Sequence, residues 1–378
     1  MKIGKDDWDG IKKRVKINKK NSENAIINLW LEKMASTFRA VFRNYLIDGI
    51  TPLADDVGKK IKEDLNIITT APIPVRAKFT LFEFIKSFIN DSSTIKSIST
   101  IKTYQSTFKH LKIFSTANSK ELEFDDITYE FRTNFIKYLQ QLGVGKNTEG
   151  KHIKVIKVFM NAATERGYNL NTIFRNKGFS KPTEDSTKVF LTKQEIQKLV
   201  DLDLSNDKMK DVVRDFFIIS CQTSLRFSDF SNLKKENIKN DRIELMTQKT
   251  GEPVVIPISP WVKNILLKYN FNLPLSPVNQ VFNRVLKDVG RQAGIDETVT
   301  ITKTIGGLQK TISYKKYELL TCHTGRRSMI SNCILAGIST PQIMLMSAHK
   351  SLKSFQLYIK ISNHQNAEVL ATHDFFNS

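Results

Sequence analysis

Apolar residues recur at intervals of three and four positions through most of this chain, which is the spacing that places them on one face of an α-helix. The first such pattern runs from Asn21 to a plausible stop at Gly49, and a second short helix is predicted at residues 54–65. The proline-containing stretch 67–78 follows and is predicted to be a linker. The N-terminal segment, residues 1–66, is therefore predicted to be a mainly helical unit.

Four further amphipathic helices are predicted between residues 79 and 182. The first begins at the capping-box pattern Thr80-x-x-Glu83, in which each side chain bonds to the backbone amide of the other residue. The other three are predicted at 98–114, 129–142 and 148–166. Four helices with apolar inner faces predict a small all-α domain over residues 79–182.

Residues 183–190 are predicted to link this domain to a larger one, residues 191–378. There the helical patterns are interrupted by two stretches with β signals on either side of a glycine, at 242–258 and 299–314, and each predicts a hairpin. The predicted fold class is therefore mainly α with a small antiparallel β-sheet, in which a helical domain is joined to a mixed α+β domain.

Composition narrows the class of partner. The chain has 378 residues, which is enough for two or three domains, and 58 Lys and Arg against 38 Asp and Glu give a formal net charge of +20. Such an excess favours a polyanion, either a nucleic acid or an anionic membrane surface. No apolar run is long enough to span a bilayer, and the polar N-terminus has no signal-peptide pattern. We therefore expect a cytoplasmic protein that binds nucleic acid and makes no membrane contact.

An ordered set of polar residues occupies the end of the chain. His323 and Arg326 are three apart, so they share a face if they lie on a helix. Tyr358 follows His349 by nine residues and lies within a helix predicted at 351–361. The cationic group and the imidazoles could hold phosphate oxygens, while the phenol is placed to attack phosphorus.

Two further cations precede this set. Arg226 directly follows a strongly apolar helix and lies between two hydrophobic residues, so it is not an ordinary surface arginine. It is either part of a buried ion pair, for which Asp229 is a candidate partner, or a ligand of phosphate. Lys249 lies at the tip of the hairpin predicted at 242–258, where a lone lysine usually has no function.

The chemistry of phosphodiester cleavage explains why these residue types belong together. Cleavage without a metal needs cations that stabilise the charge on the pentacoordinate phosphorane, and two arginines match the phosphate oxygens well. It also needs a nucleophile in line with the leaving oxygen and an acid that protonates that oxygen. A tyrosine suits the first need because its phosphodiester conserves bond energy, and a lysine on a hairpin suits the second. The histidines lack carboxylates or cysteines at metal-ligand spacing, and the three cysteines have no paired spacing, so neither a metal nor a disulfide is expected.

The ordered set resembles the tyrosine recombinase (phage integrase) family, and the match covers residues 190–378. The resemblance implies that residues 78–182 form a core-binding domain and that no cofactor is needed. Local sequence, including His323-Thr324-Gly325-Arg326, is similar to integrases of conjugative transposons and phages in Bacteroides-type bacteria. Six residues would form the catalytic set implied by the family: Arg226, Lys249, His323, Arg326, His349 and Tyr358.

The family also implies a role for each residue. The two arginines would bind the scissile phosphate, and Lys249 would act as general acid toward the 5′ oxygen. His323 would assist proton transfer with the tyrosine, and His349 would hydrogen-bond the phosphate. Tyr358 would form a 3′-phosphotyrosyl bond, which a 5′ hydroxyl of a partner duplex then attacks.

A run of lysines along the exposed side of the helix predicted at 148–166 gains meaning from this resemblance. Alone, such a run is often no more than a solvated helix face. Beside a domain that acts on phosphodiesters, contact with the DNA backbone is the favoured interpretation. The lysines on this helix and its approach are Lys146, Lys151, Lys154 and Lys157.

The resemblance further implies double-stranded DNA as the partner, a homotetramer on two duplexes, and accessory DNA-bending or excision factors. The tail, with Phe375 and Phe376, would suit docking on a neighbouring subunit. We expect a site-specific recombinase, an integrase that integrates or excises a mobile element, acting on the bacterial nucleoid. An invertase or chromosome-resolving recombinase would share the chemistry, and a DNA-binding protein with a decayed site is an alternative from another class.

Three features depart from the family pattern. Ala348 replaces the glycine usual before the second histidine, which is a mild change. Gly325 stands where leucine is frequent and is expected to loosen the start of its helix. The N-terminal arm-binding module usually begins with a small β-sheet, and residues 1–66 resemble only its end, so they are expected to be a truncated remnant.

Overall fold

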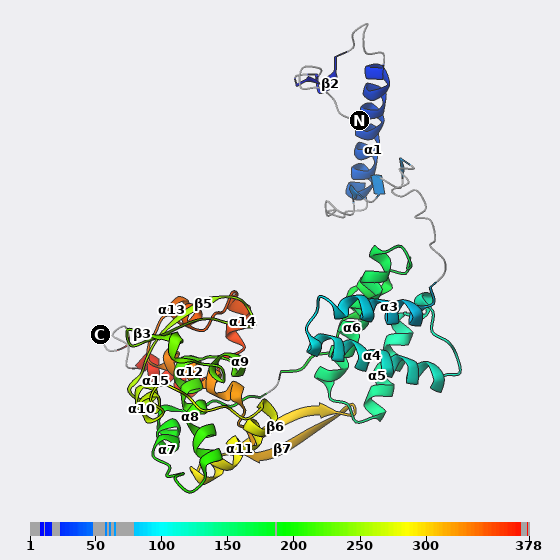
Figure 1. Ribbon diagram of the computed structural model, residues 1–378. Helices are drawn as coiled ribbons and strands as arrows, with labels where there is room; N and C mark the ends of the chain where they lie inside the picture. Colours follow the sequence, from blue (N-terminus) through cyan, green and yellow to red (C-terminus); the bar gives the residue numbers. More distant parts are fainter. Residues whose placement is uncertain are drawn as a thin grey trace. The chain divides into compact units, whose positions relative to one another are not determined.

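The computed structural model describes residues 8–10, 12–16, 23–47, 57–58, 60–61, 64–65, 79–185, 187–371 and 376 (Figure 1). The predicted linker 67–78, the expected stop at Gly49, half of the helix predicted at 54–65, and Phe375 lie outside these residues. The chain divides into two compact units, one of residues 1–128 with 156–176 and the other of residues 129–155 with 177–378. No finding tests the domain boundaries that the sequence predicts, and they stay predictions.

A two-stranded antiparallel sheet, β1 (Trp8–Asp9) and β2 (Arg14–Val15), precedes the long helix α1 (Glu23–Ile47). The Asn28 side chain holds the sheet to the helix, because it accepts from the Val15 amide and donates to the Val15 carbonyl, both at 2.8 Å. The sequence predicts the helix but not the sheet, since two-residue strands are too short to show an alternating pattern.

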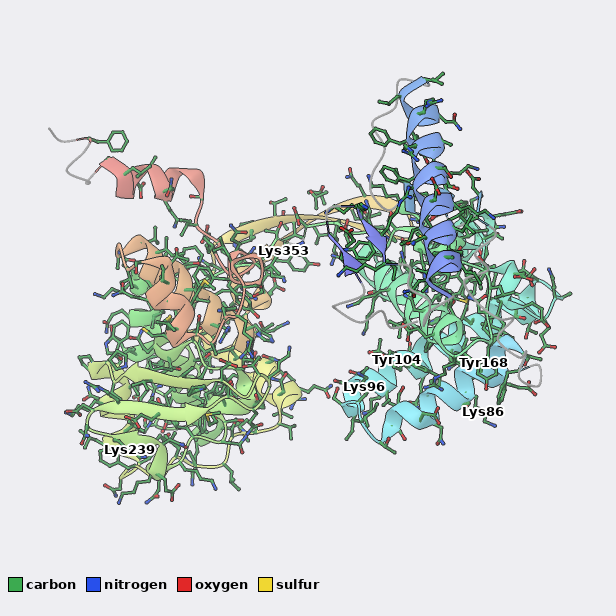
Figure 2. All side chains as sticks on the ribbon, turned by 90° about the horizontal axis from the view of Figure 1, so that it is seen from above. Lys86, Lys96, Tyr104, Tyr168, Lys239 and Lys353 are labelled. Atoms are coloured by element: carbon green, nitrogen blue, oxygen red, sulfur yellow. The ribbon has the colours of Figure 1, made fainter. Side chains whose placement is uncertain are left out.

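The helices predicted between residues 79 and 182 are present as α3 (Leu81–Ser93), α4 (Ile98–Ala117), α5 (Tyr129–Gln141) and α6 (Lys146–Glu165). The capping box at the start of α3 is confirmed, with the Thr80 amide 2.9 Å from a Glu83 carboxylate oxygen. Aromatic side chains fill the interior between α3, α4 and the second half of α6, where the Phe159 ring lies 5.5 Å from Tyr104 and 5.8 Å from Phe88. Figure 2 shows Tyr104 and Tyr168 within this unit, together with exposed lysines on both parts of the chain.

The rest of the chain is the mixed α+β part that the sequence predicts. Its first helices and its main sheet are α7 (Lys193–Val200), α8 (Lys208–Thr223), α9 (Phe227–Phe230), β3 (Ile238–Lys239), β4 (Arg242–Met246) and β5 (Pro253–Pro257). Then follow α10 (Pro260–Lys268), α11 (Asn279–Gln292), β6 (Thr298–Ile305) and β7 (Leu308–Lys315). The last helices are α12 (Cys322–Leu335), α13 (Thr340–Met346), α14 (Leu352–Gln356) and α15 (Asn363–Ala371).

Both predicted hairpins are confirmed. Strands β3, β4 and β5 form one antiparallel sheet in that order, and β6 pairs with β7 in a separate two-stranded ribbon. The ribbon is drawn in yellow and orange and is the longest pair of strands in Figure 1.

Gly325 lets two central helices approach each other closely. A Cβ atom at this position would lie 2.6 Å from the Ser220 hydroxyl oxygen of α8 and 3.2 Å from the Cys221 amide nitrogen. The expectation that Gly325 loosens its helix is therefore wrong, since α12 begins earlier, at Cys322, and the glycine serves the packing of α12 on α8. A leucine here would push the two helices apart.

A buried carboxylate lies near the start of α6. Glu149 is 1% exposed, and within the part of the chain that the structure describes its Oε1 atom has no hydrogen-bond partner. Burial raises the pKa of this carboxyl, while a hydrogen bond from Gln140 and the charge of Lys146 lower the pKa and offset part of the rise. A raised folded-state pKa stabilises the protein at low pH, and this contribution is lost as pH rises through that value.

We predict that Glu149→Gln raises the thermal unfolding midpoint by about 2 °C at pH 8 and has no such effect at pH 4. The amide keeps the shape but carries no charge, so it escapes the cost of an ionised buried group at high pH. Thermal denaturation at both pH values measures the effect. The matched control is Glu165→Gln on the exposed side of the same helix, which should change neither midpoint, and an equal gain at both pH values would contradict the prediction.

Candidate active site

Arg226 follows the end of α8 and opens α9. Helix α8 stops at Ser224, whose left-handed backbone (φ +60°) turns the chain sharply. The guanidinium atom Nη1 of Arg226 is buried and has no hydrogen-bond partner among the described residues. Within the described part of the chain, no salt bridge joins Arg226 to Asp229. The sequence left open an ion pair between Arg226 and Asp229, and the structure does not contain it. The Arg226 Nη1 donor is therefore available for an anion.

Asp229 instead anchors the turn that carries Lys249. Its Oδ1 atom accepts from the Gln248 amide at 2.9 Å. The other side of the turn is tied by an ion pair between Glu252 and Lys350, with 2.6 Å between Nζ and Oε1. The sequence singled out Asp229 only as a candidate partner for Arg226, and its position as anchor was missed because the contact joins residues far apart in the chain.

Arg326 lies in the floor of the site. It is 2% exposed, and its guanidinium donates from Nη1 to the Ser224 carbonyl at 2.6 Å and from Nη2 to the Ser347 carbonyl. Burial and the nearby charge of Arg226 lower the Arg326 pKa to about 10, while Tyr358 raises it. The side chain stays a cation at neutral pH, and these bonds fix its position.

His349 connects Arg326 to Tyr358. Its Nε2 atom lies 3.1 Å from Nη2 of Arg326, and its Nδ1 atom lies 2.7 Å from the Ser347 hydroxyl. Burial, then the charges of Arg326 and Arg226, lower the His349 pKa to about 3, so the ring is neutral at pH 7. A neutral ring can accept from Arg326 and donate to Ser347, and one of these bonds must be released before the ring can contact a phosphate.

Ala348, directly before this histidine, adopts φ +50°. That region costs an alanine about 1 kcal/mol and costs glycine nothing, which is the physical reason a glycine suits the position. The departure noted in the sequence is thus tolerated, because the backbone keeps the left-handed conformation.

Tyr358 lies against both groups. Its ring centroid is 5.0 Å from that of His349, and the Arg326 guanidinium carbon is 5.2 Å from the Tyr358 ring. The prediction that Tyr358 lies within a helix at 351–361 is wrong, because α14 ends at Gln356 and Tyr358 lies in the turn that follows. Phe355, three residues before Tyr358, is fully buried, and its packing fixes the turn on the core.

His323 and Lys249 stand at the rim. His323 lies in the first turn of α12 and Lys249 in the turn between β4 and β5, and both residues are exposed. Although part of His323 is open to solvent, partial burial lowers its pKa. The charge of Arg327 lowers this pKa further, and so do the charges of Arg326, Lys249 and Arg226. His323 therefore lies within the field of all three cations of the predicted set.

The structure thus brings the six predicted residues to one place. Four of them, Arg226, Arg326, His349 and Tyr358, form the partly buried centre, and the other two flank it. The lysines predicted to bind DNA lie on α6, exposed or half-buried, outside this cluster. Among the described residues, no group of three His, Cys, Asp or Glu side chains could hold a metal ion. No described helix is both long and apolar enough to cross a membrane.

Two family models match the chain, one for the phage integrase SAM-like domain at residues 80–179 and one for the phage integrase family at residues 189–365. The chain therefore belongs to the phage integrase family of tyrosine recombinases. No curated protein matches it.

Solved structures share the fold at low sequence identity. The Tn1549 transposon integrase (residues 82–397 of that protein) in complex with circular intermediate DNA is 13% identical, with a TM-score of 0.56 over 78% of this chain and 100% of that one. A lambda integrase dimer bound to a COC′ core site is 15% identical, with a TM-score of 0.59 over 75% of this chain and 96% of that one. A lambda integrase tetramer bound to a Holliday junction is 14% identical, with a TM-score of 0.56 over 78% and 87%.

Proposed function

We propose that this protein is a site-specific DNA recombinase that cleaves and rejoins DNA through a 3′-phosphotyrosyl intermediate. The observation that carries the proposal is the packing of Tyr358 against Arg326 and His349, beside an Arg226 guanidinium with an unused buried donor. An unpaired buried donor lowers the stability of the folded protein by about 1–3 kcal/mol. This cost indicates that the donor is paired when an anion is bound in the site.

In the proposed reaction the Tyr358 oxygen attacks phosphorus and loses its proton, with His323 assisting. The bond from phosphorus to the 5′ oxygen breaks, and Lys249 gives that oxygen a proton. Arg226 and Arg326 bind the non-bridging oxygens and stabilise the added charge of the phosphorane. Rejoining is the reverse step, in which a 5′ hydroxyl attacks the phosphotyrosine and releases Tyr358, so no external energy source is needed.

Lys249→Ala is predicted to slow single-turnover cleavage by about 10²–10³-fold with DNA affinity unchanged within about twofold, since general acid catalysis contributes about that much. A duplex with a 5′-phosphorothiolate at the scissile position tests the role directly, because a thiolate leaves without a proton. The variant should regain most of its rate on that duplex. A slow rate on both substrates would remove Lys249 from the acid role.

DNA contact is proposed for the α6 lysines Lys146, Lys151, Lys154 and Lys157. The lambda integrase tetramer on a Holliday junction supports a homotetramer on two duplexes as the working form. We propose integration or excision of a mobile element on the bacterial nucleoid, aided by accessory DNA-bending factors. Inversion or chromosome resolution would use the same chemistry, and the similarity to Bacteroides-type integrases stays a prediction.

Covalent trapping tests the proposed function. The protein is mixed, in EDTA, with nicked duplexes that carry the ends of its own genetic element, and the products are separated on denaturing gels. We expect an adduct whose tryptic phosphopeptide contains Tyr358. Tight binding to the same duplexes without any adduct would favour the alternative of a DNA-binding protein with a decayed site.

A further inference from the structure

The tip of the β6–β7 ribbon is bonded to the loop between α5 and α6. The Gly306 amide donates to the Val144 carbonyl at 3.2 Å, and Ile305 forms an antiparallel bridge with Gly145. The ribbon belongs to the mixed α+β part, whereas the loop precedes the lysine-bearing helix α6. Without these contacts, the loop and the ribbon would be connected only by the polypeptide between them, which includes the linker.

The turn of the ribbon is shaped for this contact. Gly306 and Gly307 both have positive φ, at +58° and +77°. A Cβ on Gly306 would lie 3.1 Å from the Gln140 carbonyl oxygen, and one on Gly307 would lie 3.0 Å from the Gln140 side-chain oxygen. The two glycines therefore serve both the turn and the close approach of α5, which a turn free in solvent would not require.

Glu184, within the segment predicted to be the linker between the two domains, bonds to both sides of the contact. Its carboxylate accepts from the Thr304 amide of the ribbon at 2.9 Å. Its backbone amide and carbonyl bond to the Asn147 side chain of α6, at 3.1 and 3.0 Å. Close by, a Cβ on Gly150 would collide with the Pro182 carbonyl oxygen, so the chain just before the linker also lies tightly along α6.

We propose that the β6–β7 ribbon is a splint for the linker: it fixes the start of α6 on the mixed α+β part before DNA arrives. The inference rests on the proposed function, since it gives the splint the task of holding Lys146, Lys151 and Lys154 in place for the duplex. A linker that is already ordered loses less conformational freedom on binding, so the splint strengthens DNA affinity without touching the reacting atoms. Glu184 is a positioning residue in this scheme.

The competing idea is a lid, in which the same contacts hold the protein closed and must break to admit DNA. The two ideas predict opposite effects for loosening the contact, since a splint that is loosened weakens DNA binding and a lid that is loosened strengthens it. The bonds of Glu184 to both the ribbon and α6 favour the splint. The ribbon contacts the linker itself, which already joins α6 to the mixed α+β part, so these contacts add no second connection that would have to open for the duplex.

The first experiment is Glu184→Ala in the full chain. It removes the acceptor of the Thr304 amide and should raise the Kd for a cognate duplex about tenfold, as expected for a lost hydrogen bond to a charged group. Single-turnover cleavage at saturating DNA should stay within about twofold. Glu184→Gln keeps an acceptor oxygen and should restore affinity, while Asp185→Ala, which removes the neighbouring exposed carboxylate, should leave it unchanged.

A readout without DNA separates failure of the splint from failure of the proposed function. In the free protein, trypsin should cut after the exposed Lys188 several-fold faster in Glu184→Ala than in the unchanged chain. Equal rates and equal affinities would overturn the splint even if cleavage of DNA is normal. Faster proteolysis with no covalent adduct in any variant would instead support the ordered linker and refute the proposed reaction.

A cross-link decides between splint and lid. Gly145 and Ile305 face each other as bridge partners, and a Cβ on Gly145 meets only the Thr304 carbonyl oxygen, at 3.6 Å, so a Gly145→Cys, Ile305→Cys pair has room to form a disulfide. The oxidised protein should bind and cleave DNA as well as the reduced one. Loss of DNA binding on oxidation, restored by dithiothreitol, would show a lid and overturn the proposal.

Discussion

Tyr358→Phe is expected to abolish the covalent protein–DNA adduct and to reduce strand cleavage by more than about 10⁴-fold, the scale seen when a nucleophile is removed. The variant lacks one oxygen atom and keeps the ring. That ring still packs 5.0 Å from the His349 ring centroid and 5.2 Å from the Arg326 guanidinium carbon, so the phosphate-binding groups keep their positions. DNA affinity should therefore stay within about twofold, as measured by titration of a labelled duplex.

The control for this variant is Tyr129→Phe, which removes the hydroxyl of an exposed tyrosine at the start of α5. It should form as much adduct as the unchanged protein. An adduct that persists in Tyr358→Phe would show that another residue is the nucleophile. Loss of both adduct and DNA affinity would mean that the phenol oxygen holds the DNA itself, which the proposed roles do not require.

Much of the fold could be predicted because its signals are local. The capping box at Thr80, the two hairpins and the helices around them each follow from a few neighbouring residues. The end of α14 could not be predicted in this way. Apolar spacing continues past Gln356, yet the chain leaves the helix before Tyr358, and there Tyr358 and Ile359 pack against the buried cluster that contains Phe355.

The candidate site was predictable as a set of residue types in order, but its internal bonding was not. The sequence left two interpretations of Arg226 open, an ion pair or a phosphate ligand, and only the structure shows that Asp229 accepts from the Gln248 amide instead. The role of Gly325 was misjudged for a similar reason. Its neighbour in space is Ser220, more than a hundred residues away, and no local pattern reports that contact.

Arg226→Met is expected to reduce cleavage by about 10³-fold while leaving the fold as stable as before or more so. In most buried arginines the substitution would break bonds and destabilise the protein. Here Nη1 is buried and no described residue bonds to it, so the unbound protein bears the cost of a desolvated donor. Methionine, of similar length, has no such donor. A residue that lowers the stability of the unbound protein but binds an anion in the complex is expected at a functional site.

Three measurements make this prediction sharp. Cleavage of a suicide duplex should fall, and the thermal midpoint should not. The His349 pKa, followed by NMR, should rise from its low value, because Arg226 is one of the charges that depress it. Arg291→Met, at an exposed arginine of α11, should change none of the three. A lower thermal midpoint in Arg226→Met with near-normal cleavage would show that this arginine serves the fold, and the anion-binding role would then rest on Arg326 alone.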